Sequence, residues 1–226
     1  MKRLLFGAFV FALFNLQIVL AQGATTEDLL PRVLIIGDSI SIGYVPYVSQ
    51  MMKRDAVVKH NQGNAQHTGT GLKNINQWLG DTKWDVIHFN WGLWDFCYRS
   101  PESRAPGKTD KTHVSITTPL KQYEINLEQL VSRLEKTGAK LIWASTTVVP
   151  EGEVCRFVGD DWKYNEVAAR VMKAHGIKID DLYKLTKGFP PGLFEGPGDV
   201  HYTHAGYKII AAQVADSIRS ALNKGM

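Results

Sequence analysis

The stretch RVLIIGDSIS, Arg32 to Ser41, decides the fold. It is a short, β-branched apolar run that stops abruptly at Gly37 and is followed by Asp38 and Ser39. Short, almost continuously apolar strands are typical of parallel sheets that are buried on both faces. The sequence therefore predicts a buried strand over Arg32–Ile36, with Ser39 just beyond its carboxyl end.

The rest of the chain alternates between strand and helix patterns. Further strands are predicted at Ala56–Lys59, Asp85–Asn90, Lys140–Thr146 and Ile177–Ile179. Apolar residues at three- and four-residue spacing predict three helices, one starting at Thr118-Pro119 as N-cap and first helical proline and ending at Gly138, the others over Trp162–His175 and His204–Leu222. This alternation predicts an α/β fold in which helices cover both faces of one parallel sheet.

In such a sheet, ligands bind beyond the carboxyl ends of the strands. Two long loops, Leu93–Thr117 and Thr147–Asp160, each follow a predicted strand and rise from that edge. They carry Cys97 and Cys155, which would be neighbours in a strand order of 2-1-3-4-5. The cysteines would meet an oxidising compartment if the chain is exported, so a disulfide and two separate thiols both stay open.

The amino terminus has the pattern of a secretory signal peptide. Lys2 and Arg3 precede an apolar run, Leu4–Leu20, and small residues offer cleavage after Ala21. We therefore expect residues 1–21 to be removed, leaving residues 22–226 as a single domain that is secreted or periplasmic. A retained membrane anchor is the alternative, although the run is short for a spanning helix.

Composition excludes some partners. The 226 residues are 44% hydrophobic and 21% charged, which is ordinary for a globular protein. Without Lys2 and Arg3 the formal charge of +4 falls to +2, too little to indicate nucleic acid or an anionic membrane. We expect neither a nucleic-acid partner nor stable membrane insertion after leader cleavage; the oligomeric state is left open.

A serine, a histidine and an aspartate form the candidate catalytic group. A serine hydroxyl attacks a carbonyl only if a base takes its proton, and that base is usually a histidine oriented by a carboxylate. Ser39 is the candidate nucleophile, His201 the base and Asp199 the orienting acid. Each residue alone indicates little, because a serine after a strand often caps a helix and loops are rich in aspartate.

Here the sequence resembles the SGNH (GDSL-type) hydrolases, serine esterases with a flavodoxin-like three-layer α/β/α sandwich and a five-stranded parallel sheet of order 2-1-3-4-5. The block GDSIS, Gly37–Ser41, places Ser39 at the family's nucleophile. In DVHYTHAGY, His201 stands five residues before Gly206, as the family's catalytic histidine does, which favours His201 over His204.

The chain departs from the family pattern twice. The family's Gly-x-Asn-Asp block, whose Asn donates to the oxyanion, reads GLWD here, so that Gly92 and Asp95 match and Trp94 replaces the Asn. The indole N–H of Trp94 or the amide of Asn90 is the expected substitute. The family acid stands three residues before the histidine, where this chain has Gly198, and Asp199 is only two residues before His201. The alternatives to Asp199 are therefore a backbone carbonyl, another acid or no acid at all.

A backbone N–H of Gly63, with Gly69 as a competitor, is the expected further oxyanion donor. Trp91 and Trp94 are expected at the rim of the site, where an indole can stack on a sugar or narrow an acyl pocket.

The resemblance implies a serine esterase that works through an acyl-enzyme without a cofactor or metal, and the leader pattern adds the expectation that it is secreted. Its expected partner is a small ester or an acylated glycan, with acetyl esters on carbohydrate first. The alternatives are a lysophospholipase or thioesterase for longer acyl chains, a catalytically weak carbohydrate-binding member of the same fold, and a metal site built from Asp199, His201 and His204.

Overall fold

The computed structural model describes residues 29–99, 111 and 114–223. The predicted signal peptide lies outside the described residues. Within them, no helix has both the length and the apolar character that a membrane span requires.

Five parallel strands form the sheet, in the order β2-β1-β3-β4-β5. Their bounds are β1 Arg32–Ile36, β2 Val57–His60, β3 Val86–Phe89, β4 Lys140–Ala144 and β5 Lys178–Asp180. The predicted strand order is confirmed, and four of the five strands differ from the prediction only at their ends. The first, Arg32–Ile36, has the predicted bounds.

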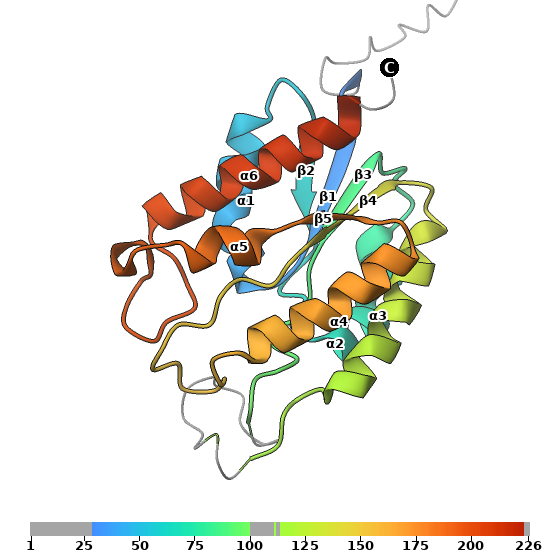
Figure 1. Ribbon diagram of the computed structural model, residues 1–226. Coiled ribbons are helices and arrows are strands. Elements are labelled where there is room, and N and C mark those ends of the chain that lie inside the picture. Colours follow the sequence, from blue (N-terminus) through green and yellow to red (C-terminus); the bar gives the residue numbers. More distant parts are fainter. Residues whose placement is uncertain (1–28, 100–110, 112–113, 224–226) are drawn as a thin grey trace, which may run out of the picture.

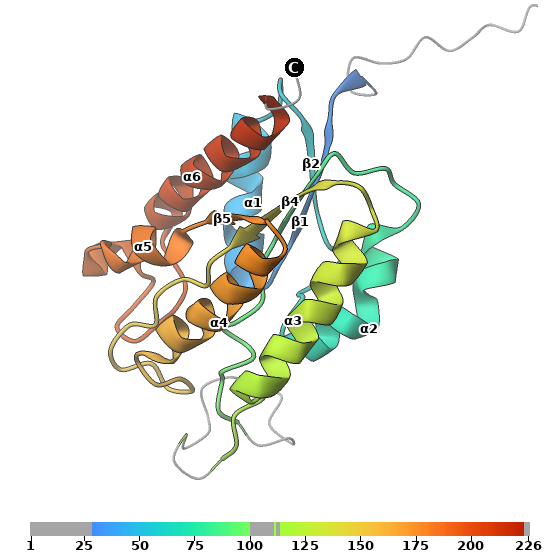
Figure 2. The ribbon, with the colours of Figure 1, turned by 45° about the vertical axis from the view of Figure 1, so that its right-hand side comes forward.

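Helices cover both faces of the sheet (Figures 1 and 2). On one side lie α1 Ser39–Met51, α5 Leu182–Lys187 and α6 His204–Asn223; on the other lie α2 Thr68–Leu79, α3 Leu120–Glu135 and α4 Asp160–Ala174. A short 3-10 turn, Pro191–Leu193, precedes α6. The predicted three-layer α/β/α sandwich is therefore confirmed.

The centre of the sheet explains its apolar strands. Val33 to Ile36 of β1 are at most 2% exposed, and every residue of β3 is buried. His88 of β3 is the polar exception, and its ring pairs with the carboxylate of Asp180 at 3.0 Å. Helices on both faces remove this strand surface from water, which is the main source of stabilisation in such a layer.

Two local predictions are corrected by the packing. Thr118 does not cap α3; its backbone N–H donates to the Asp95 carbonyl, and Pro119 occupies the position before the helix. Trp91 is only 1% exposed, so it belongs to the core and not to the rim. Local sequence does not reveal either feature. The hydrogen bond of Thr118 depends on Asp95, which is distant in the chain, and the burial of Trp91 depends on the packing around it.

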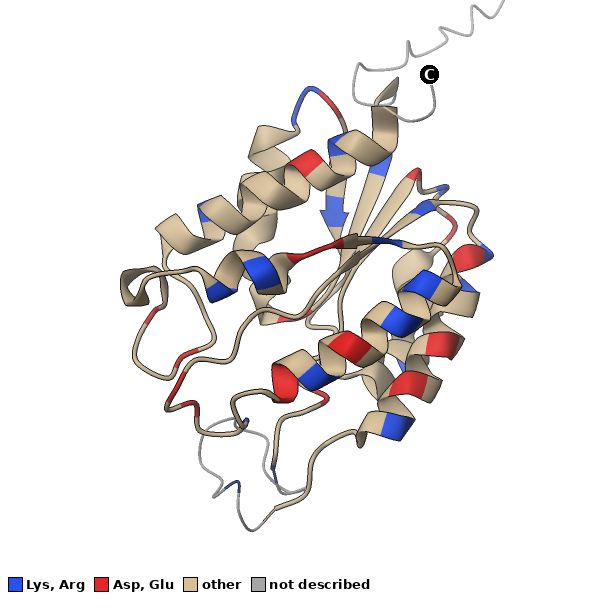
Figure 3. Cartoon of the chain, viewed as in Figure 1, with Lys and Arg blue, Asp and Glu red and all other residues tan. Residues whose placement is uncertain are grey.

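Charged side chains are mixed over the helices. In Figure 3 both signs occur along α3, α4 and α6 in the view shown. This mixing fits the low formal charge, and α5, which carries only the lysines Lys184 and Lys187, is an exception in that view.

Candidate active site

The turn after β1 is built to present Ser39. The Asp38 carboxylate accepts the Ile40 N–H at 3.0 Å and so caps α1, which makes Ser39 the first residue of that helix. Gly37 is required because a Cβ there would lie 2.7 Å from the hydroxyl of Ser41. The loop after β2 ties this turn down, since the Asn61 side chain accepts the Gly37 N–H at 2.9 Å.

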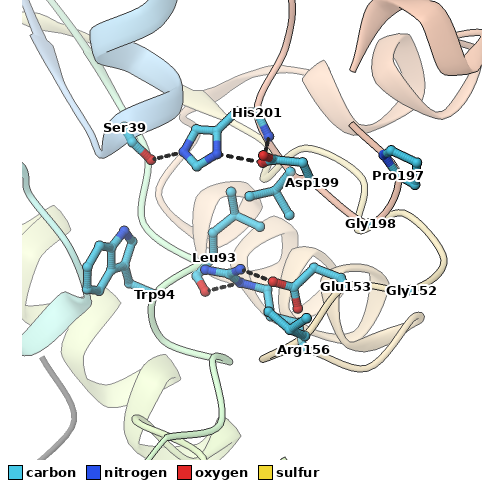
Figure 4. Close-up of a pocket in the computed structure, with 12 residues that line it drawn as sticks. Ser39, Leu93, Trp94, Gly152, Glu153, Arg156, Pro197, Gly198, Asp199 and His201 are labelled. Carbon is cyan, nitrogen blue, oxygen red and sulfur yellow. Dashed lines mark hydrogen bonds and ion pairs between the residues drawn. The ribbon is translucent and has the colours of Figure 1, made fainter. Parts of the chain in front are cut away.

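Ser39 meets His201 at the carboxyl edge of the sheet. The two residues are 162 positions apart in the chain, yet the Ser39 Oγ lies 2.9 Å from the Nε2 of His201 (Figure 4). This is hydrogen-bond distance, the separation that a general base needs to take the hydroxyl proton. The base comes from the loop that leads into α6.

Asp199 completes a chain of hydrogen bonds. Its Oδ1 lies 2.7 Å from the Nδ1 of His201 and also accepts the His201 backbone N–H at 2.9 Å. One carboxylate oxygen thus orients both the ring and the backbone of the histidine, despite a spacing of only two residues. The His201 and Asp199 side chains are 38% and 41% exposed, so the pair remains in contact with solvent.

The acid is at position 199 and not 198 for a steric reason. Gly198 has a φ of +71°, and a Cβ on it would lie 2.5 Å from the carbonyl oxygen of Gly152. No side chain fits between these two loops, so position 198 cannot carry the acid. The Asp199 N–H donates to the Gly196 carbonyl and closes a turn. This turn places the Asp199 carboxylate against the imidazole ring of His201.

A pocket of about 310 Å³ opens in front of Ser39 and His201. The long loops supply its other walls, with Leu93 and Trp94 from one and Glu153, Val154 and Arg156 from the other (Figure 4). Its volume is at the lower end of the range for small-molecule sites, about 300–1,000 Å³.

Trp94 faces this pocket and keeps a free donor. Figure 4 shows the indole nitrogen on the side of the ring turned toward Ser39. Among the described residues, no group accepts a hydrogen bond from this N–H. The guanidinium of Arg99 lies over the indole, 4.6 Å from the ring centroid, so its positive charge packs against the face of the ring.

The other expected oxyanion residues lie elsewhere. The Asn90 amide donates to the Ala144 carbonyl at 2.7 Å and to the Thr146 hydroxyl at 3.1 Å, so both its hydrogens join strand ends. Gly92 packs against Thr146, where a Cβ would overlap the hydroxyl. Gly63 is exposed. The residues that line the pocket do not include Gly63, Asn90 or Gly92.

Two local features, one of them in the pocket wall, were missed by sequence reasoning. Arg156 is a largely buried part of the pocket wall, where its Nε donates to the Leu93 carbonyl at 2.6 Å and its Nη1 pairs with Glu153 at 2.9 Å. Gln66 has a φ of +50°, the single positive value among described non-glycine residues. Such a backbone conformation costs energy, and here it lies in the loop before α2, outside the residues that line the pocket.

Buried carboxyl groups surround the site. Burial raises the pKa of Asp38, while the Ile40 N–H, Arg156 and His201 oppose that rise. Burial also raises the pKa of Asp95 to about 7, against hydrogen bonds from Thr68 and Thr118. Asp95 accepts from the Thr68 hydroxyl at 2.6 Å and from its N–H, and therefore fixes the start of α2.

The fold and the site together define a doubly wound α/β protein with a Ser–His–Asp hydrogen-bond chain at the carboxyl edge of its sheet. The chain belongs to the GDSL-like lipase/acylhydrolase family, whose model matches residues 35–209. Membership of this family and the esterases and lipases among its structural neighbours support an ester hydrolase.

Solved structures show the same fold at low sequence identity. The lipase/acylhydrolase from Enterococcus faecalis has a TM-score of 0.68 and 20% identity over 84% of this chain and 96% of that chain. A catalytic mutant of Axe2, an acetylxylan esterase from Geobacillus stearothermophilus, has a TM-score of 0.63 and 17% identity over 83% and 94%. The acetyl xylan esterase AlAXEase has a TM-score of 0.64 and 14% identity over 83% and 99%. No curated protein matches the chain in sequence.

Proposed function

We propose that this protein is a serine esterase that removes short acyl groups, acetyl first, from carbohydrate. The observation that carries the proposal is the hydrogen-bond chain from Ser39 through His201 to Asp199, with separations of 2.9 and 2.7 Å. The modest pocket volume favours a small acyl group. Two of the structural neighbours are acetylxylan esterases, which makes acetylated glycans the first substrates to test.

The proposed mechanism has two acyl-transfer steps. His201 takes the Ser39 proton as the hydroxyl attacks the ester carbonyl, and the protonated ring then gives that proton to the leaving alcohol. Asp199 stabilises the imidazolium. Water activated by His201 then attacks the acyl-enzyme, which releases the acid and restores Ser39.

We assign two oxyanion donors from the residues around Ser39. The first is the backbone N–H of Ser39, because amides in the first turn of a helix lack intrahelical partners and attract negative charge. The second is the indole N–H of Trp94, which takes the part of the family asparagine. A single donor of this kind is worth about 2.7–4 kcal/mol of transition-state stabilisation.

The test is the Ser39→Ala variant. We expect it to fold, to lose hydrolysis of p-nitrophenyl acetate and to lose labelling by a fluorophosphonate. Ser49→Ala on the same helix is the matched control and should keep both. A folded Ser39→Ala protein that retains hydrolysis would falsify the assignment. If wild type resists the fluorophosphonate and only retains glycans, the protein is a binding member of the fold.

Longer acyl chains are the second candidate, because the loop that supplies one pocket wall carries an exposed apolar strip, Val154, Phe157 and Val158. Val154, which lines the pocket, is 51% exposed, and Phe157 and Val158 are 38% and 53% exposed. Such a strip can accept an acyl tail that extends beyond the cavity. Higher kcat/KM for the decanoyl than for the acetyl p-nitrophenyl ester would favour a lysophospholipase or thioesterase.

Export is part of the proposal. The leader pattern over residues 1–21 supports a protein that acts outside the cytoplasm. N-terminal sequencing of the protein from the export compartment should begin at Gln22. A sequence that begins at Met1 in a membrane fraction would favour the retained anchor.

A further inference from the structure

Cys97 and Cys155 face each other across the two pocket loops. Both are free thiols, 1% and 0% exposed, with their Sγ atoms 2.7 Å apart. Their backbones also lie together, because the Tyr98 N–H donates to the Cys155 carbonyl at 2.6 Å. Cysteines can be bridged without backbone movement only where the backbones are close and the side chains point at each other. This pair meets both conditions.

We propose that Cys97 and Cys155 are a covalent modification site, oxidised to a disulfide that fixes the walls of the active-site pocket. One loop supplies Leu93 and Trp94 to the pocket, and the other supplies Glu153, Val154 and Arg156. In the reduced protein these loops are joined by polar contacts, such as Arg156 Nε to the Leu93 carbonyl and Lys111 Nζ to the carbonyls of Glu153 and Arg156. The disulfide adds a covalent bond between the two loops, which water cannot compete with as it competes with hydrogen bonds.

The reaction is a thiol–disulfide exchange with an oxidised partner, either a dithiol oxidoreductase or glutathione disulfide. While the chain is still open, either cysteine can attack as its thiolate; with Cys97 as the attacking group, its thiol first gives its proton to solvent. Cys97 bonds to one partner sulfur and releases the other as a thiolate. Cys155 then loses its proton, attacks the Cys97 sulfur and releases the second partner thiolate. Two thiols are oxidised and one partner disulfide is reduced.

The burial of both sulfurs sets when this happens. A partner cannot reach thiols that are at most 1% exposed, so the exchange takes place while the chain folds. For the same reason the finished disulfide should resist reductants until the protein unfolds. The bond closes a loop between residues 58 positions apart, and long loops lose the most unfolded-state entropy when they are cross-linked.

The test uses the full chain and begins without an activity assay. Reduced, denatured protein is refolded in a buffer of reduced and oxidised glutathione, denatured again and treated with iodoacetamide. We expect neither cysteine to be alkylated and mass spectrometry to find the Cys97 peptide joined to the Cys155 peptide. Two alkylated cysteines, or glutathione adducts alone, would overturn the proposal.

The role at the pocket has its own readout. The oxidised wild type should melt about 5–15 °C above the protein refolded with reductant. A disulfide that closes a loop of this size raises the free energy of unfolding, and this increase corresponds to such a rise in Tm. The double variant Cys97→Ser, Cys155→Ser should melt at one temperature in both buffers. Oxidised wild type that melts no higher than reduced would show that the bond does not brace the loops. A several-fold lower KM in the oxidised form rests on the proposed esterase function, whereas alkylation and melting do not.

Discussion

Replacing Asp199 with Asn tests whether this carboxylate is the orienting acid despite its short spacing from His201. The change removes one negative charge and keeps an oxygen that can still accept from the ring. At 2.7 Å, two unit charges attract by about 6 kcal/mol at an effective dielectric constant of 20 and by about 1.5 kcal/mol at that of water. Because the Asp199 side chain is 41% exposed, we take about 3 kcal/mol, which is a loss of roughly 10²-fold in kcat.

The assay is hydrolysis of p-nitrophenyl acetate at saturating substrate, together with the rate of fluorophosphonate labelling. Both should fall together in Asp199→Asn, because the imidazolium forms in each reaction. Glu195→Gln is the matched control; it removes an exposed carboxylate from the same loop and should stay within about twofold of wild type. Activity of Asp199→Asn within threefold of wild type would refute the reasoning and leave His201 as a base without an acid.

Two further predictions concern Trp94 and Asp95. Trp94→Phe keeps a ring under Arg99 but loses the N–H, so kcat should fall by about 10²–10³-fold with little change in KM. Trp162→Phe, at an exposed position of α4, is the control and should leave kcat unchanged. An unchanged kcat in Trp94→Phe would exclude Trp94 as a donor. For Asp95, the pKa of about 7 in the folded protein lies above the ordinary value of 3.8. The protonated carboxyl therefore adds its full contribution to the free energy of unfolding below the unfolded pKa, and this contribution is lost as pH rises toward 7. Between pH 5 and pH 8 the free energy of unfolding, measured in urea, should fall by about 2–3 kcal/mol more in wild type than in Asp95→Asn. An equal fall in both proteins would contradict a raised pKa for the buried carboxyl.

Much of the fold could be predicted because its signals are local. The apolar run before Gly37 and the helical spacing that ends at Gly138 each reflect the surroundings of a single element, and Gly138 indeed takes a φ of +71° just beyond α3. The strand order followed from the resemblance and from the alternation of elements. The first residue of α3 was misplaced, since the contact of Thr118 with Asp95 joins two separate loops.

The sequence by itself determined the doubly wound sandwich, because hydrophobic period is a property of short segments. The pairing of Ser39 with His201 was expected because the motif around each residue resembles a block of the same family. Only the tertiary structure decided which groups face the reacting hydroxyl. The Asn90 amide is used by the Ala144 carbonyl, the indole N–H of Trp94 donates to no group among the described residues, and the contact of Gly198 with Gly152 moves the acid to Asp199. These outcomes depend on steric fit between loops that are distant in the chain, and no local pattern encodes that fit.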